Sequence, residues 1–203
     1  MELTASRMRV SLQPLTVVAL GPLTNVALAC RIAPDFPSKV SLVVMGGAIT
    51  ARGNQGPASE FNFECDPEAA SICLRLFPTV TLLPWELMLK HTLPWERVEA
   101  WTSRENERST FLRHMLEKVA AREKERGDDF VACDPVALAV ALEPTLVTAA
   151  TMVHVAVELA GEVTRGQSVV DWHGVLKDGR KSVRLVEGVD MERFCVLMDR
   201  CVK

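Results

Sequence analysis

The stretch from Leu15 to Met45 reads LTVVALGPLTNVALACRIAPDFPSKVSLVVM and contains two apolar runs separated by a helical segment. The first run, 15–20, is rich in β-branched residues, and the second, 40–45, is continuous rather than alternating, so both favour buried strands. A Gly-Pro pair ends the first run before an expected helix at 23–31, and residues 34–37 are expected to form a loop. A strand, a helix and a second strand in this order predict a βαβ unit with parallel strands.

The rest of the chain continues to alternate strands with helices. Asp66-Pro67-Glu68 has the composition of a helix start, because Asp is a good N-cap and Pro fits the first helical position. A highly charged segment, 96–125, carries apolar residues at helical spacing, which favours a helix with one apolar stripe and a solvated charged face. The stripe consists of Phe111, Leu112, Met115, Leu116, Val119 and Ala120. Further strands are expected at 79–83, 152–159 and 182–186, helices at 67–77, 136–142 and 191–201, and turns at 165–166 and 178–179. The pattern predicts an α/β fold with a mainly parallel sheet, in which ligands bind beyond the carboxyl ends of the strands.

The composition is that of an ordinary globular protein. Of the 203 residues, 48% are hydrophobic and 24% are charged, and 23 Lys and Arg against 26 Asp and Glu give a net charge of −3. These values exclude a disordered chain. The slight acidic excess argues against a nucleic-acid-binding protein, since phosphate binding depends on clustered Lys and Arg. The length allows one large domain or two small ones.

The cellular compartment can be inferred from the apolar segments and the cysteines. The longest stretch without a charge, 10–30, does not predict a membrane span, because prolines, a glycine and polar residues interrupt it. Residues 1–13 lack the pattern of a secretory signal peptide. Six cysteines without a Cys-x-x-Cys pair and four histidines without metal-type spacing favour reduced, mostly buried thiols. We therefore expect a cytoplasmic protein.

The densest group of polar side chains follows the second apolar run. Asn54, Glu60 and Asn62 lie between a glycine-rich loop and the helix start at Asp66. A carboxylate accepts hydrogen bonds from sugar hydroxyls, and an Asn amide both donates and accepts, so these groups could bind a hydroxyl-rich ligand. The same pattern also fits a polar surface loop in which Asn54 and the glycines supply turns, and the residues alone favour that interpretation.

Cys133 and Asp134 precede a second predicted helix, whose Asp134-Pro135 start resembles the Asp66-Pro67 start. Asp134 fits an N-cap, whereas a site for a hard cation such as Ca²⁺ needs about six to eight oxygen ligands, which one Asp cannot supply. Cys133 could be a nucleophile if the helix N-terminus lowered its pKa and a histidine acted as base. Nothing in the sequence orients a histidine toward it, so a buried, unreactive cysteine is the simpler interpretation. His154 lies in an apolar run, which favours a core histidine over a catalytic one.

Three groups of short motifs occur in a fixed order along the chain. They are VALGPLTN at 18–25; VMGGA at 44–48 with GN at 53–54, EFN at 60–62 and DPEAA at 66–70; and CDP at 133–135 with TRG at 164–166 and VD at 170–171. Each motif alone is weakly specific, but their order and spacing cover nearly the whole chain. Together they resemble the inosine-uridine preferring nucleoside hydrolases, calcium-dependent enzymes that hydrolyse the N-glycosidic bond of ribonucleosides.

The resemblance implies an open α/β fold with helices on both faces of the sheet. It also implies hydrolysis of purine and/or pyrimidine ribonucleosides to ribose and free base, with a Ca²⁺-bound water as the nucleophile. The expected partner is therefore a small-molecule ribonucleoside, and the resemblance suggests a homodimer or homotetramer.

The resemblance also assigns roles to residues by position. Thr24 would bind Ca²⁺ through its backbone carbonyl, and Asp134 would bind the same ion through its carboxylate. The substrate-binding positions are Met45, Asn54, Glu60, Phe61 and Asn62. Cys133 stands where the better-known members carry a histidine that acts as general acid, so the resemblance assigns it as the catalytic residue of a cysteine-bearing variant. A thiol with an unperturbed pKa of about 8.5 could donate a proton near neutrality.

One motif of the family is missing from this sequence. The other calcium-binding aspartates belong to a D-x-D-x-G-x-D-D segment on the family's first strand, whereas Glu2 is the only acidic residue between Met1 and Val18. We therefore expect residues 1–203 to form a single partial domain, the C-terminal two-thirds of the family fold without its N-terminal strand region, with an incomplete calcium site. The main alternative is a catalytically inactive truncated form that acts as a dimerisation or interaction fragment. A hydrolase built on a Cys133 nucleophile is a third hypothesis.

Overall fold

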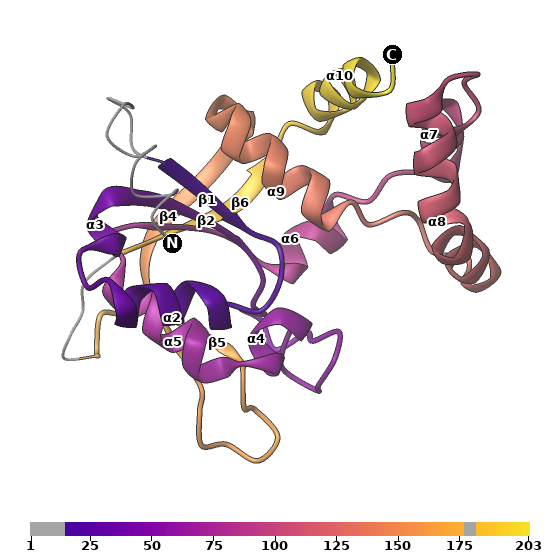
Figure 1. Ribbon diagram of the computed structural model, residues 1–203. Coiled ribbons are helices and arrows are strands. Elements are labelled where there is room, and N and C mark those ends of the chain that lie inside the picture. Colours follow the sequence, from indigo (N-terminus) through magenta and orange to yellow (C-terminus); the bar gives the residue numbers. More distant parts are fainter. Residues whose placement is uncertain (1–14, 177–181) are drawn as a thin grey trace.

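The computed structural model of the chain describes residues 15–176 and 182–203, which form a six-stranded sheet flanked by helices (Figure 1). The strand order in the described sheet is β1-β2-β3-β6-β4-β5. The strands are β1 Leu15–Ala19, β2 Val40–Met45, β3 Val80–Leu83, β4 Val147–Val157, β5 Ser168–Asp171 and β6 Val183–Val189. The turn expected at 178–179 lies outside the described residues.

Strands β1, β2, β3 and β6 run parallel, whereas β4 is antiparallel to β6 and β5 is antiparallel to β4. The open, mainly parallel sheet that the sequence predicts is therefore confirmed. In the first βαβ unit, Leu15 of β1 pairs with Val40 of β2.

Two strands differ from the prediction. Strand β4 begins at Val147 rather than at residue 152, and β5 was not predicted. The first half of β4 is exposed and carries small side chains, so it lacks an apolar run, and its strand conformation comes from pairing with β6. Strand β5 is four residues long and pairs with 154–157 of β4, a contact that a local pattern does not reveal.

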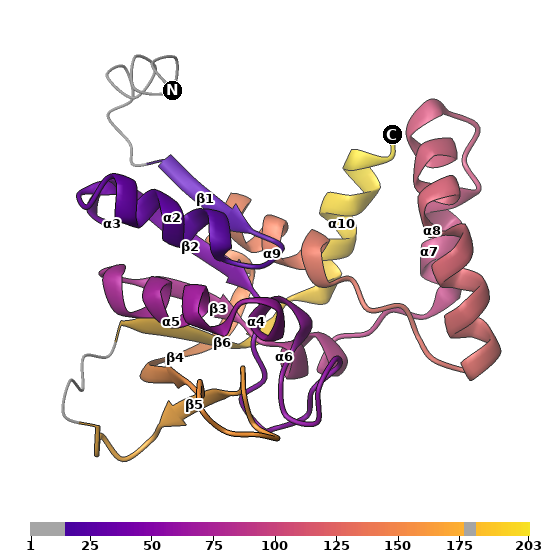
Figure 2. The same cartoon turned by 60° about the horizontal axis from the view of Figure 1, so that its bottom comes forward.

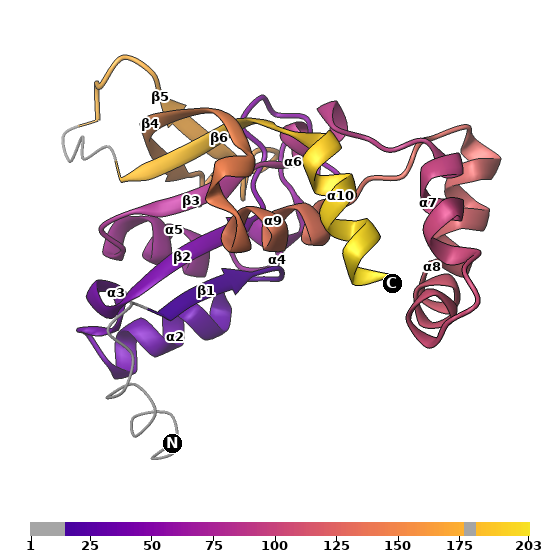
Figure 3. The same cartoon turned by 90° about the horizontal axis from the view of Figure 1, so that it is seen from above.

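The helices form layers on both sides of the sheet, as Figure 3 shows from above. They are α2 Thr24–Ile32, α3 Phe36–Lys39, α4 Phe61–Cys65, α5 Pro67–Leu76, α6 Trp85–Lys90, α7 Trp95–Thr102, α8 Glu107–Arg126, α9 Cys133–Leu142 and α10 Met191–Cys201, with a 3-10 turn, η1, at Pro144–Leu146. None of the helices in the described ranges is both long and apolar enough to cross a membrane.

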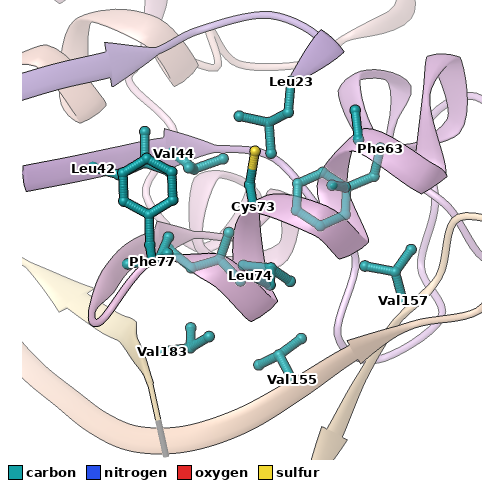
Figure 4. Close-up of a cluster of buried hydrophobic side chains, with 14 of the residues drawn as sticks. Leu23, Leu42, Val44, Phe63, Cys73, Leu74, Phe77, Val155, Val157 and Val183 are labelled. Atoms are coloured by element: carbon teal, nitrogen blue, oxygen red, sulfur yellow. The ribbon is translucent and has the colours of Figure 1, made fainter. Parts of the chain in front are cut away.

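Two hydrophobic cores lie on opposite faces of the sheet, because successive side chains of a strand point to opposite faces. In β2, Leu42 and Val44 belong to one core, whereas Val43 and Met45 belong to the other. Helices α2 and α5 cover the first core, whose side chains are drawn in Figure 4, and α9 and α10 cover the second. The apolar run at 40–45 is thus continuous because both faces of β2 are buried, and the expected helices on both faces are confirmed.

The structure confirms the predicted helix start at Asp66 and contradicts the predicted loop at 34–37. The Asp66 carboxylate accepts a hydrogen bond from the N–H of Ala69 at 3.0 Å and caps α5, which begins at Pro67 as expected. The loop expected at 34–37 is wrong, because Phe36 begins the short helix α3. Pro37 is compatible with this helix, since it lies in the first turn, where its missing N–H costs no hydrogen bond.

The charged segment forms two helices, α7 and α8, which lie side by side at the periphery of the molecule (Figure 2). Leu112 and Leu116 pack against the second core, whereas Phe111 and Met115 are exposed. Only part of the predicted apolar stripe is therefore packed against the core. The packed part is narrower than the apolar part because α8 is covered along one side only.

All six cysteines lie in the described residues and are free. Cys30, Cys73 and Cys195 are buried, Cys133 is partly buried, and the remaining two are exposed. The thiols are therefore less uniformly buried than expected.

Candidate active site

The residues with predicted roles gather at the edge of the sheet where the parallel strands β1, β2 and β3 end. Thr24 begins α2 after β1, and Met45 is the last residue of β2. Glu60 directly precedes α4, and Cys133 begins α9. Ligands are expected beyond this edge, because the carboxyl ends of parallel strands lie together.

Glu60 is the central polar group of this edge, and its side chain is only 2% exposed. Its Oε1 accepts a hydrogen bond from the N–H of Asn62 at 3.0 Å. Its Oε2 accepts from the N–H groups of Gly47 at 2.8 Å and Phe63 at 3.3 Å. Burial raises the pKa of the Glu60 carboxyl, the three N–H donors oppose this, and the negative charge of Asp134 adds to it. The carboxylate therefore both caps α4 and fixes the turn after β2.

The two asparagines are held by hydrogen bonds that leave part of each amide available. Asn62 is buried, and its Nδ2 donates to the carbonyl oxygen of Met45 at 3.0 Å. Asn54 is exposed, and its Oδ1 accepts from the N–H of Phe61 at 2.8 Å. No described residue donates a hydrogen bond to the Oδ1 of Asn62, and none accepts one from the Nδ2 of Asn54. One acceptor and one donor group are thus available for hydroxyls.

Asp134 does not cap α9, contrary to one of the interpretations of its sequence. The helix begins one residue earlier, at Cys133, and its N-cap Ala132 makes no side-chain hydrogen bond. Within the described parts of the chain, the Asp134 carboxylate has no hydrogen-bond partner, and partial desolvation raises its pKa. A carboxylate at this position that caps nothing is available for a ligand.

Cys133 is held in its neutral thiol form. Burial raises its pKa to about 12, and the nearby charges of Asp134 and Glu60 contribute in the same direction. A thiol with this pKa is almost entirely protonated near neutrality, which argues against the hypothesis of a Cys133 nucleophile. Of the histidines, His114 is exposed on α8, His154 lies in β4, and neither forms a hydrogen bond with this thiol.

Thr24 is tied to the start of α5 rather than to the other polar groups of the site. Its Oγ1 donates to Oδ2 of Asp66 at 2.5 Å, while Oδ1 of the same carboxylate caps α5. Asp66 therefore fixes the beginnings of two helices, α2 and α5, relative to each other.

The donors present do not complete a calcium site. Thr24 and Asp134 supply one carbonyl and one carboxylate, whereas Ca²⁺ takes about six to eight oxygens. In residues 15–176 and 182–203, no group of three or more His, Cys, Asp or Glu side chains has an arrangement that could hold a metal ion. The His, Cys, Asp and Glu side chains of the described residues therefore do not by themselves fit the ion.

Glu86, in the first turn of α6 after β3, is a further polar residue of this edge that is not predicted from the sequence. Its carboxylate accepts hydrogen bonds from the N–H groups of Ile49 and Thr50. A signal was present, since Glu86 follows the carboxyl end of a predicted strand, at the same edge as the other site residues.

The arrangement of these groups can be compared with known proteins. A family model described as inosine-uridine preferring nucleoside hydrolase matches residues 2–195. This chain belongs to that family. The structure of this chain superimposes with a TM-score of 0.90 on an inosine-guanosine nucleoside hydrolase, at 29% identity, covering 99% of this chain and 67% of that one. A purine-preferring ribonucleoside hydrolase from Gardnerella vaginalis gives a TM-score of 0.82 at 28% identity and covers 99% and 64% of the two chains.

Curated relatives of this chain include the pyrimidine-specific ribonucleoside hydrolase RihA of Shigella boydii serotype 4 and of Escherichia coli K12. In both cases the identity is 34% over 201 residues, covering 97% of this chain and 64% of the relative. The chain thus spans 64% of the length of these relatives. By their names, the relatives differ in the nucleobase that they accept.

Proposed function

We propose that this protein hydrolyses the N-glycosidic bond of purine and/or pyrimidine ribonucleosides to ribose and free base. The observation that supports it is the hydrogen-bonded group Met45, Asn54, Glu60, Phe61 and Asn62, to which the family resemblance assigns substrate binding. This group presents an amide donor, an amide acceptor and a carboxylate at the edge where the parallel strands end. Such a set suits ribose, because each hydroxyl can both donate and accept a hydrogen bond.

The proposed role of these residues is to bind and orient the ribose while positive charge develops at its anomeric carbon. A buried carboxylate such as Glu60 stabilises that charge more strongly than a solvated one would, because the surrounding dielectric is low. In the net reaction, the oxygen of water bonds to the anomeric carbon, the bond to the base nitrogen breaks, and a proton ends on the base. Phe61 is half-exposed and would supply an apolar contact to the substrate.

Cys133 is the proposed catalytic residue on the leaving-group side. Because its pKa is raised to about 12, we propose that it acts as a hydrogen-bond donor to the departing base rather than as an efficient proton donor. This differs from the expectation based on an unperturbed thiol.

Calcium is proposed as the cofactor on the family resemblance alone, with Thr24 and Asp134 as two of its ligands. These two residues supply only two of the roughly six to eight oxygens that Ca²⁺ takes, so the proposed site needs further ligands. A cytoplasmic location and a homo-oligomeric state also remain predictions. The alternative of an inactive interaction fragment gains no support from the relatives, which are named as hydrolases.

The function is tested by measuring release of free base from inosine, guanosine, uridine and cytidine, with Ca²⁺ and with a chelator. The measurement is made on the chain itself and on a version extended at its N-terminus by an Asp-rich segment of a relative. We expect calcium-dependent release from the extended version at least. If neither protein released base from any of the four nucleosides, the proposed function would be wrong.

A matched pair of variants tests the ribose-binding role. Asn54→Ala should raise KM for the nucleoside by roughly tenfold, because one hydrogen bond to a hydroxyl is lost. Gln55→Ala, the next residue in the same loop, should leave KM unchanged. Equal effects of the two substitutions would contradict the assignment of Asn54.

A further inference from the structure

Glu86 joins helix α6 to the backbone of the loop that follows β2. Its Oε2 accepts a hydrogen bond from the N–H of Ile49 at 3.1 Å. Its Oε1 accepts from both the N–H and the Oγ1 of Thr50, at 2.7 and 2.8 Å. Three donors from two consecutive residues thus converge on one carboxylate 36 residues further along the chain.

The residue before Glu86 holds the start of the same segment. The N–H of Trp85 donates to the carbonyl of Gly47 at 2.9 Å, so α6 fixes the segment 47–50 at both of its ends. The residue that follows, Ala51, has a φ of +59° and is the one non-glycine residue of the described chain with a positive φ. This conformation is unfavourable for alanine and persists only where neighbouring contacts impose it. The hydrogen bonds of Glu86 to Thr50 lie directly before it and supply such contacts.

Beyond Ala51, the loop leads to the proposed ribose-binding group. The N–H of Asn54 donates to the carbonyl of Ser59 at 3.2 Å, and its Oδ1 accepts from the N–H of Phe61. The far end of the loop is therefore anchored at α4, while the near end is anchored by Glu86. Because the loop between these anchors carries Asn54, the position of its amide depends on both.

We propose that Glu86 is a positioning residue that fixes the 50–59 loop and, through it, Asn54. The fixation of the loop follows from this chain's own contacts, whereas the consequence for ribose binding rests on the proposed function. A carboxylate is required, since both of its oxygens accept hydrogen bonds. A glutamine would turn an NH₂ group toward one of the backbone N–H donors and keep only one acceptor.

The chain contains a matched control for this residue. Glu86 follows Pro84-Trp85 at the start of α6, and Glu96 follows Pro94-Trp95 at the start of α7. Glu96 is exposed and accepts no hydrogen bond from the described residues. The two glutamates therefore share their local sequence and helix position but differ in their tertiary contacts.

Limited proteolysis with trypsin tests the fixation without reference to activity. Arg52 is exposed within the loop, and the rate of cleavage after it reports the fraction of loop that is open. We expect Glu86→Ala to increase this rate by about tenfold or more, because hydrogen bonds to a charged acceptor are lost. Glu86→Gln should give a smaller increase, and Glu96→Ala should give none. The fragment ending at Arg52 is quantified by mass spectrometry, and thermal unfolding of each variant separates local opening from global destabilisation.

The outcomes distinguish this proposal from the proposed function. If Glu86→Ala and Glu86→Gln were cleaved after Arg52 at the wild-type rate, the positioning role would be wrong, whatever the activity. If cleavage increased as expected and nucleoside KM rose more than kcat fell, both proposals would be supported. If cleavage increased while neither the chain nor its N-terminally extended version released base, the positioning of the loop would stand and the proposed function would fail.

Discussion

The backbone N–H of Gly47 donates a hydrogen bond to Oε2 of Glu60 at 2.8 Å. This contact connects the turn that leaves β2 to the start of α4, and it brings the two ends of the polar loop together. The loop is therefore closed by a side chain that also belongs to the proposed ribose-binding group. A substitution at Glu60 should therefore affect both the stability of this loop and the proposed binding of ribose.

Replacing Glu60 with alanine should lower the free energy of unfolding by roughly 2 kcal/mol or more, because buried N–H donors lose their acceptor. The control Glu105→Ala removes an exposed carboxylate that no described residue hydrogen-bonds and should change stability little. Urea denaturation of both variants provides the comparison. A Glu60→Ala protein as stable as the control would show that the contacts at Gly47, Asn62 and Phe63 do not hold the loop.

Replacing Gly47 with alanine should destabilise the protein more than replacing Gly174. Both glycines have positive φ, +80° and +68°, so each alanine should cost about 1–2 kcal/mol for its backbone conformation. A Cβ at Gly47 would also lie 2.4 Å from Oγ of Ser168, whereas nothing lies within 4 Å of one at Gly174. The difference between the two melting temperatures measures this crowding, and equal melting temperatures would contradict it.

Cys133 should react slowly with iodoacetamide. At pH 8, a thiol whose pKa is about 12 has a thiolate fraction on the order of a thousandfold smaller than an ordinary thiol. Cys65 and Cys201 are exposed and should be labelled first. Peptide mass spectrometry over time gives the individual rates. Labelling of Cys133 as fast as Cys65 would revive the hypothesis of a reactive thiolate.

Asp171 should contribute stability that is lost in acid. Hydrogen bonds from the N–H groups of Leu176 and Val175 hold the pKa of its carboxyl below the usual value of 3.8. Because the folded-state pKa is lowered, the contribution is complete above the unfolded value and disappears as the pH falls through the folded one. The difference in melting temperature between the wild type and Asp171→Asn should therefore shrink as the pH falls from about 5 to 3. A constant difference over that range would argue against this role.

Local sequence was sufficient for the elements whose own residues specify them. The strands β1 and β2 follow from apolar runs, and the start of α5 follows from Asp66 and Pro67, because capping acts within one turn. Helix α10 occupies 191–201 as expected. The order of the motifs was sufficient to predict the family, and through it the residues that share the carboxyl edge of the sheet.

Long-range contacts decided what local sequence left open. Strand β5 exists because it pairs with β4, and the exposure of Phe111 reflects how little of α8 its neighbours cover. The Asp134-Pro135 pair has the sequence of a helix start, but α9 begins at Cys133, so the Asp134 carboxylate does not cap it. Glu86 accepts hydrogen bonds from backbone N–H groups 36 and 37 residues away in the sequence. The sequence by itself determined the βαβ framework and the family, since periodicity, capping and motif order are encoded locally. The tertiary structure alone decided which carboxylates are buried, which accept hydrogen bonds and which have no hydrogen-bond partner among the described residues. Burial and hydrogen bonding depend on residues that meet only after folding.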